Sequence, residues 1–285
     1  MHALRLRFLA LVLLLLAGAP AHAQDPCPQL RGQAGSPDVA TRIAAVACQE
    51  NIAWFRAFID ADGRSGGQPV YEAENDTLAD GVPAWKKVAA YWNGSGLAND
   101  CTPPGARCRN FVVDTPWSAA FVSWVMRRAA LPGFAASSRH VDYVRAAWRQ
   151  PASSPYRLAA PGDAAPAPGD LLCYVRVGAR AFGHEGLLDR LDGNAGLPMH
   201  CDIVVAAEAG VAWLVGGNVQ QVVALRMLRL DAQGRFADLP LRSAASGATC
   251  SADAPEQCNL NRQDWAALLK LKTGAAGALV AANAH

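Results

Sequence analysis

Residues 117–125 read Trp-Ser-Ala-Ala-Phe-Val-Ser-Trp-Val and place a small hydroxyl side chain at the start of an apolar helix. Pro116 suits the first helical position, and Pro132-Gly133 marks the end of the helix. Ser118 is then in the first turn, where unpaired backbone N–H groups and the helix dipole stabilise an anion such as an oxyanion. The same spacing also fits a simpler interpretation, in which Ser118 is a small residue under a packed helix face.

A second informative region is a predicted β-hairpin with polar groups at both ends. Residues 200–205, His-Cys-Asp-Ile-Val-Val, predict one strand, and residues 211–215 predict the returning strand. Gly216-Gly217-Asn218 follows directly. Upstream, Pro168-Gly169-Asp170 leads into the apolar residues 171–175, which predict a buried strand. The chain order is therefore a helix with a candidate nucleophile, a strand, a histidine strand and an asparagine strand.

This order of motifs resembles the papain-like cell-wall amidases and peptidases of the CHAP and NlpC type. Residues 117–124 are similar to the start of their nucleophile helix, residues 168–170 to their Pro-Gly-Asp strand, 200–205 to their histidine strand and 217–218 to their Gly-Asn turn. The resemblance covers roughly residues 70–232 and is closer still to a bacterial family of unknown function that looks like a branch of this clan. It implies an α+β, papain-like fold, in which an antiparallel sheet packs on the nucleophile helix.

One departure from the clan changes the expected chemistry, because Ser118 occupies the position of the family's cysteine. A thiolate is accessible near neutral pH, whereas a serine must lose its proton to a base during attack. The resemblance implies a Ser-His-Asn site in which Ser118 attacks, His200 acts as base and then acid, and Asn218 orients the imidazole. Asp202 lies on the same strand face as His200 and adds negative potential. The first hypothesis is an exported hydrolase that cleaves an amide bond in cell-wall peptides.

Three other side chains are candidates for the lining of the cleft: Trp117, His140 and His184. His140 shares a helix face with Val144, so it is either a packing residue or a member of the site. His184 also stands in a sequence that looks like a catalytic-histidine motif, but we rank His200 above it because His200 precedes an apolar strand. Two alternatives to catalysis stay open. One is an inactive protein that binds wall peptides in the same cleft, and the other is a structural secreted domain.

The N-terminus predicts export from the cytoplasm. Residues 1–23 read as a secretory signal peptide, with two arginines, an apolar run and Ala21-His22-Ala23 as the cleavage site. No cysteine follows the predicted cleavage site to accept a lipid, and the apolar run is shorter than the ~20 residues that span a bilayer. We therefore expect a periplasmic or secreted protein without a membrane anchor after cleavage.

Eight cysteines fit such an oxidising compartment. Three local pairs are plausible from their spacing, and they leave one cross-strand pair. The candidates are Cys27 with Cys48, Cys101 with Cys108, Cys250 with Cys258, and Cys173 with Cys201. The spacing does not settle the connectivity, since eight cysteines allow 105 pairings. No paired Cys-x-x-Cys motif appears, so we expect no zinc site.

Composition excludes some partners and sets the domain boundaries. The 285 residues are 52% hydrophobic and 18% charged, with a net charge of +2 and no basic run, which argues against nucleic acid. We expect a peptide or peptidoglycan substrate and no cofactor. The predicted units are a signal peptide, an N-terminal helical extension, a papain-like domain and a flexible tail, over residues 1–23, 24–69, 70–272 and 273–285. Within the domain, the patterns predict a surface loop over 94–110, a connector over 178–199 and a helix over 261–271.

Overall fold

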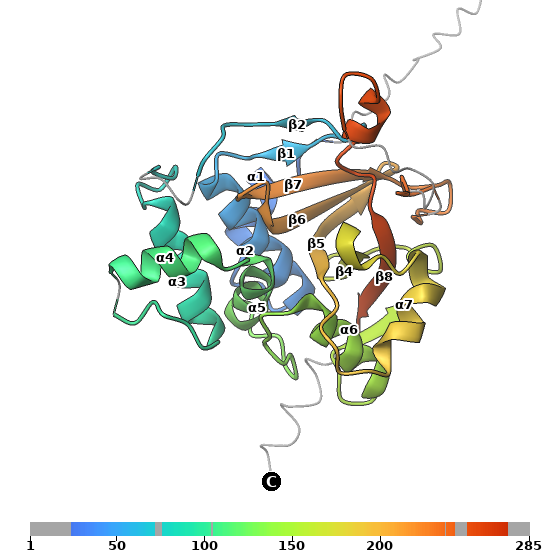
Figure 1. Cartoon of the computed structure of the whole chain (residues 1–285), viewed down its shortest axis with the longest axis horizontal. Helices are drawn as coiled ribbons and strands as arrows, with labels where there is room; N and C mark the ends of the chain where they lie inside the picture. The colour runs from blue at the N-terminus through green and yellow to red at the C-terminus, as the bar shows by residue number, and fades with distance from the viewer. Residues whose placement is uncertain (1–23, 72–75, 104, 237, 243–249, 273–285) are drawn as a thin grey trace, which may run out of the picture.

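The computed structural model describes residues 24–71, 76–103, 105–236, 238–242 and 250–272, so the expected signal peptide and tail lie outside the described residues. The fold is α+β (Figure 1). The helices are α1 (Cys27–Leu30), α2 (Val39–Ala53), α3 (Ala84–Ser95), α4 (Ala106–Asp114), α5 (Ser118–Arg128), α6 (His140–Arg149) and α7 (Gly183–Leu191), with short 3-10 turns at Arg31–Gln33, Val177–Ala179 and Pro255–Cys258. The strands are β1 (Phe58–Ile59), β2 (Ser65–Gly66), β3 (Tyr156–Ala159), β4 (Leu171–Val175), β5 (Met199–Glu208), β6 (Val211–Val219), β7 (Val222–Arg229) and β8 (Asp264–Leu271).

The strands form one eight-stranded sheet in the order β2-β1-β7-β6-β5-β4-β8-β3. Neighbouring strands are antiparallel except at one edge, where β1 runs parallel to β7. The expected antiparallel sheet is therefore wrong at that edge, and the sheet is mixed. The predicted strand over residues 171–175 and the hairpin over residues 200–215 are confirmed as β4, β5 and β6.

Alternation along the strands gives the sheet two packed faces. On β4, Leu171, Cys173 and Val175 join the larger hydrophobic core with α2 and α5. Leu172 and Tyr174 join a smaller core on the opposite face, which also contains residues of β6 and β8. Because both faces are covered, β4 is buried along its whole length, as its unbroken apolar run predicts.

Helix α2 belongs to the main core, although its segment was expected to form an N-terminal extension. The side chain of Asp38 accepts a hydrogen bond from the backbone N–H of Thr41 and so caps this helix. Asn51 on α2 donates to the carbonyl of Val223 on β7 at 3.0 Å. Figure 1 shows α2 and α5 side by side against the sheet, with α3 and α4 on one flank and α6 and α7 on the other.

Three local predictions are wrong. The predicted helix over residues 261–271 is strand β8, because a short apolar run fits either element and pairing with β3 and β4 decides it. The predicted connector over residues 178–199 contains helix α7, whose Leu187 and Leu191 are buried one turn apart. The predicted loop over residues 94–110 gives way to α4 at Ala106.

All four candidate disulfides are formed: Cys27–Cys48, Cys101–Cys108, Cys173–Cys201 and Cys250–Cys258. The Cys173–Cys201 bond links β4 to β5, where the two residues are register partners. Four disulfides are consistent with a periplasmic or extracellular protein. Among the helices of the described residues, none combines the length and the hydropathy that a membrane span requires.

Candidate functional site

Helix α5 begins at Ser118, two residues later than Pro116 suggested, with Trp117 as its N-cap residue. Its first intrahelical hydrogen bond joins the N–H of Phe121 to the carbonyl of Trp117 at 2.9 Å. The N–H groups before Phe121 therefore have no intrahelical acceptor and remain free to face an anion. Trp117 was expected to line the cleft, but it is fully buried and its ring stacks on that of Trp54 at 5.5 Å. Its role is to anchor the start of the helix in the core.

His140 is the histidine in direct contact with Ser118. It is the first residue of α6, and its Nε2 atom lies 2.9 Å from the Ser118 hydroxyl oxygen. Both side chains are buried, with 3% and 6% of their residue surfaces exposed. Of the two interpretations left open for His140, the structure supports membership of the site. A serine hydroxyl within hydrogen-bond distance of an imidazole is the basic geometry of a serine nucleophile and its base.

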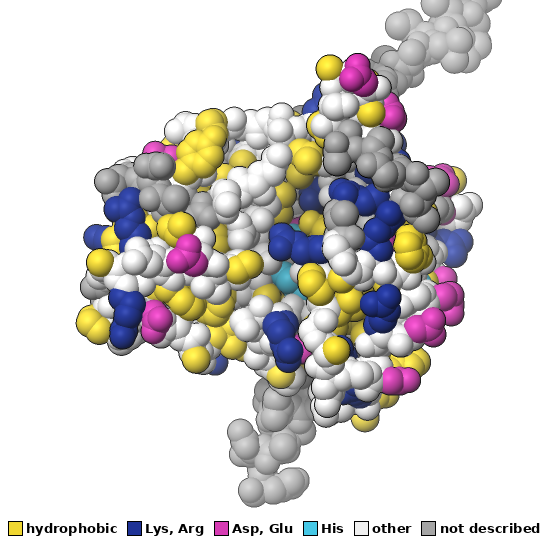
Figure 2. Space-filling model, in the orientation of Figure 1, with side chains coloured by type: hydrophobic (Ala, Val, Ile, Leu, Met, Phe, Trp, Pro, Cys, Tyr) yellow, Lys and Arg dark blue, Asp and Glu magenta, His cyan; other side chains and the backbone are white. Residues whose placement is uncertain are grey.

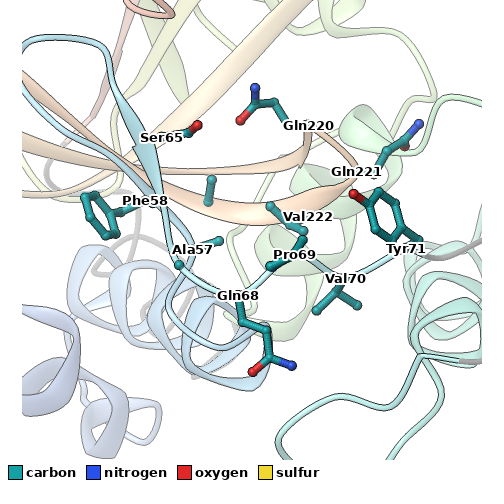
Figure 3. Close-up of a pocket in the computed structure, with 13 residues that line it drawn as sticks. Ala57, Phe58, Ser65, Gln68, Pro69, Val70, Tyr71, Gln220, Gln221 and Val222 are labelled. Carbon is teal, nitrogen blue, oxygen red and sulfur yellow. The ribbon is translucent and has the colours of Figure 1, made fainter.

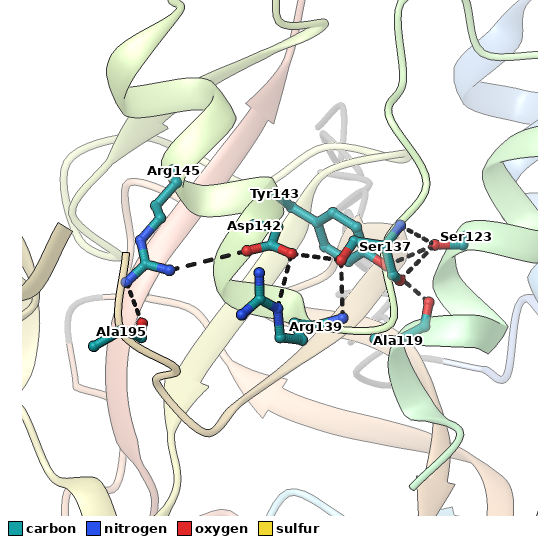
Figure 4. A network of polar contacts seen from close by, with 8 residues as sticks. All are labelled: Ala119, Ser123, Ser137, Arg139, Asp142, Tyr143, Arg145 and Ala195. Carbon is teal, nitrogen blue, oxygen red and sulfur yellow. Dashed lines mark hydrogen bonds and ion pairs between the residues drawn. The ribbon is translucent and has the colours of Figure 1, made fainter. Parts of the chain in front are cut away.

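A network of hydrogen bonds holds α6 against α5 and so fixes the position of His140 (Figure 4). The Tyr143 hydroxyl donates to the carbonyl of Ala119 at 2.8 Å and contacts the Ser123 hydroxyl at 2.7 Å. Ser123 in turn accepts from the N–H of Ser137 at 3.1 Å. Since Ala119 adjoins Ser118, the network ties the turn before α6 directly to the N-terminal end of α5.

His200 forms a second polar chain next to His140. Its Nε2 atom lies 2.7 Å from a carboxylate oxygen of Asp202, and the other oxygen accepts from Arg226 Nε at 2.8 Å. The ring of His200 lies 5.2 Å from that of His140 and 5.1 Å from that of Tyr174. The expected alignment of His200 with Asp202 on one strand face is confirmed. Among the described residues, no hydrogen bond joins His200 to Ser118, because His140 occupies that place.

Arg226 was not among the site residues predicted from the sequence, although its position in the chain indicates that it is unusual. It is the one charged residue inside the apolar run of β7 from Val222 to Leu228. A charge in a buried strand needs a buried partner. Arg226 is 2% exposed and also donates to the side-chain oxygen of Asn261 at 2.8 Å.

Burial and charge set the protonation of these groups. Burial lowers the pKa of His140 well below its usual range, and the adjacent His200 and Arg176 lower it further. His140 is therefore neutral at neutral pH and able to accept a proton. Burial by itself raises the pKa of Asp202, but His200 and Arg226 outweigh it and hold that pKa well below its usual range. Asp202 is therefore a buried carboxylate anion.

Asn218 does not make the contact expected of it. Among the described residues its side chain forms no hydrogen bond, and Asp202 takes the place beside His200. Asn218 instead has a left-handed backbone with φ 57°, at the irregularity where β6 and β7 shift register. Asparagine tolerates this conformation better than most residues. The Gly-Asn motif thus shapes the backbone here.

The two glycines before Asn218 allow β6 to approach the site closely. A Cβ atom on Gly216 would lie 1.9 Å from a carboxylate oxygen of Asp202. A Cβ atom on Gly217 would lie 2.5 Å from the ring of Phe121 on α5. Both approaches require glycine, since real Cβ contacts are never so short.

We expect Gly217→Ala to lower the free energy of unfolding by about 1–3 kcal/mol, because the new methyl group meets the buried Phe121 ring. Urea unfolding followed by circular dichroism measures the loss. Gly35→Ala is the matched control, since a Cβ atom there meets nothing within 4 Å. Equal midpoints for the two variants would contradict the close packing of β6 on α5.

Ser118 and His140 open into a pocket of about 320 Å³. Its other lining residues are Pro116, Ser138, Arg139, Arg176, Gly196, Leu197, Pro198 and Met199. Figure 2 shows lysine and arginine side chains gathered around a hollow near the middle of one face, in which histidine is visible. The pocket therefore combines a serine hydroxyl, a neutral imidazole, an apolar wall and positive charge.

Two other predicted features have structural roles. His184 lies in the first turn of α7, where its Nδ1 atom is 2.8 Å from the carbonyl of Ala266, and it does not line the pocket. Asp170 of the Pro-Gly-Asp motif is buried, accepts from the N–H of Leu271 and pairs with Lys270. It joins the start of β4 to the end of β8.

A second pocket, of about 450 Å³, lies beside the β1–β2 hairpin and the turn between β6 and β7 (Figure 3). Exposed Phe58 and Tyr71 contribute aromatic rings, and Gln68, Gln220 and Gln221 contribute amides. None of its lining residues is a histidine, a cysteine or a charged residue. This second pocket therefore lacks the imidazole and guanidinium groups that line the pocket of Ser118. In the part of the chain that the structure describes, no cluster of histidine, cysteine, aspartate and glutamate could hold a metal ion.

Residues 79–271 match the profile of a family described as uncharacterized proteins conserved in bacteria, DUF2272. The match covers more than half of the chain, which therefore belongs to this family. It includes the whole candidate site. No curated protein matches the chain, and no solved structure matches it. The likeness to CHAP and NlpC amidases accordingly rests on the sequence motifs alone.

Proposed function

We propose that this protein is an exported hydrolase that cleaves an amide bond in cell-wall peptides through an acyl-enzyme on Ser118. The observation that carries the proposal is the 2.9 Å contact between the Ser118 hydroxyl and a buried, neutral His140 inside a pocket. The motifs predicted His200 and Asn218 as the partners of Ser118, and the proposal replaces them with His140 because that ring contacts the hydroxyl.

In this proposal each group has one chemical role. The Ser118 hydroxyl attacks the carbonyl carbon while its proton passes to Nε2 of His140, and the same proton then goes to the leaving amine. The first-turn N–H groups of α5 donate to the oxyanion. His140 has no carboxylate partner of its own, but the anionic Asp202 partly offsets the lowering of its pKa and so favours the imidazolium that forms. Water then attacks the acyl-enzyme and releases the acid.

A second candidate function is the binding of wall peptides without turnover. The observation that favours it is the Nδ1 atom of His140, which is buried and has no hydrogen-bond partner among the described residues. In serine triads a carboxylate at that nitrogen orients the imidazole and stabilises its charged form. Without that carboxylate, Ser118 would serve as a hydrogen-bonding group in a binding pocket.

Incubation of the mature protein with purified peptidoglycan, followed by mass analysis of the soluble fragments, separates the two functions. We expect fragments with new carboxyl and amino termini at one type of amide bond. A protein that sediments with the peptidoglycan and releases no fragment would contradict hydrolysis and support binding. A protein that does neither would contradict both.

A further inference from the structure

The pocket of Ser118 carries positive charge that the protein itself does not neutralise. Arg176 directly follows β4, lines the pocket and is exposed. Among the described residues its side chain forms neither a hydrogen bond nor an ion pair. Arg139 lies on the same wall, but its Nε atom is bound to Asp142 at 3.1 Å. Of the two pocket arginines, Arg176 is the one without a carboxylate partner among the described residues.

No carboxylate is among the described residues that line the pocket, and two that contact or influence those residues have other partners. Asp202 is held by His200 and Arg226, and Asp142 is held by Arg139 and the hydroxyl of Ser137. Neither carboxylate is available to neutralise the positive charge of Arg176. Arg176, His140 and Ser118 line the same pocket, so an anion bound by Arg176 would share that pocket with the Ser118 hydroxyl.

We infer that the pocket recognises a substrate carboxylate through Arg176, beside the bond that Ser118 attacks. A guanidinium presents parallel N–H donors that match the two oxygens of a carboxylate. A substrate that ends in a neutral amide has only one such oxygen and no charge, so it cannot make the same paired contact. Leu197, Pro198 and Met199 form the adjacent apolar wall. The substrate class is therefore a peptide with a free carboxylate next to an apolar side chain. The inference deepens the proposed function and rests on it only for the step of cleavage.

The test measures binding without turnover, in the Ser118→Ala background. The probes are N-acetyl-alanyl-alanine, in its L and D forms, and the corresponding C-terminal amides. Isothermal titration is expected to give a dissociation constant about tenfold or more lower for the acid than for the amide, as a charge-assisted hydrogen bond provides. Arg176→Gln is expected to abolish this difference. Arg128→Gln is the control, because Arg128 is exposed at the far end of α5.

Equal binding of acid and amide, a preference that survives Arg176→Gln, or no binding of either probe would overturn the inference. Inorganic phosphate is the competing anion, and tighter binding of phosphate than of the acid would overturn the assignment to a carboxylate. Failure of the hydrolase proposal is distinguishable, since the Arg176-dependent preference would then persist in a protein that releases no fragment. Conversely, release of fragments without a preference for the acid would support hydrolysis and contradict the proposed recognition of a substrate carboxylate.

Discussion

Replacement of Ser118 by alanine is expected to lower the rate of fragment release from peptidoglycan by at least about a thousandfold. The variant lacks the oxygen that forms the acyl-enzyme, and what remains is the pocket and the first-turn N–H groups of α5. The rate is measured by mass spectrometry as new termini per unit time. Because Ser118 is buried and small, the alanine variant should keep the fold, which far-UV circular dichroism checks.

Two variants make this result specific. Ser118→Cys introduces the cysteine that the sequence motifs led us to expect at this position, and it is expected to retain or gain activity because the helix start stabilises a thiolate. Ser153→Ala changes an exposed serine away from the pocket and is expected to leave the rate unchanged. Full activity of Ser118→Ala would remove Ser118 from the mechanism.

The same assay is expected to distinguish the roles of the three histidines. His140→Gln is expected to lose activity nearly as completely as Ser118→Ala, because in the proposed mechanism His140, which contacts the Ser118 hydroxyl, accepts its proton. His184→Gln is the matched control, since that ring binds the Ala266 carbonyl outside the pocket. Activity that survives in His140→Gln but not in His200→Gln would return the role of base to His200.

Much of the sheet could be predicted because its strands carry local signals. The unbroken apolar run of β4 and the turn between β5 and β6 predict their elements without tertiary information. The final strand, β8, could not be distinguished from a helix, because every residue from Asp264 to Leu269 is buried and alternation is absent. Its hydrogen-bonded pairing with β4 and β3 makes the segment a strand, and that pairing joins residues roughly a hundred positions apart.

The site was predictable only in part: the sequence pointed to Ser118, His140, His200 and Asp202, but not to which histidine contacts the serine. Period-two alternation places His200 and Asp202 on one face of β5, and the structure joins them. It cannot show that α6 brings His140 between Ser118 and His200, because the angle of α6 depends on the network through Tyr143 and Ser123. Arg176 was missed for a related reason, since an arginine after a strand is unremarkable until the pocket around it is known.

Asp202→Asn is expected to lower the free energy of unfolding by about 3–5 kcal/mol, which is the cost of leaving one partner of a buried ion pair uncompensated. The substitution keeps the size of the side chain and removes its charge, so Arg226 stays buried without its anion. Urea unfolding with the disulfides intact measures the loss. Asp62→Asn is the control: Asp62 pairs with Arg229 at the surface, and its loss should barely move the midpoint.

A double variant separates lost pairing from lost packing. Arg226→Met in the Asp202→Asn protein removes the unpaired cation and is expected to recover part of the stability, as apolar replacements of buried ion pairs do. If stability does not recover, a charge-based cause is contradicted.

The dependence on pH gives a second test, since the pKa of Asp202 is lower in the folded protein than its unfolded value of about 3.9. Ionised Asp202 therefore stabilises the fold at pH values above its unfolded pKa, and this contribution is lost as the pH falls toward its pKa in the folded protein. The wild type should consequently lose more stability in acid than Asp202→Asn.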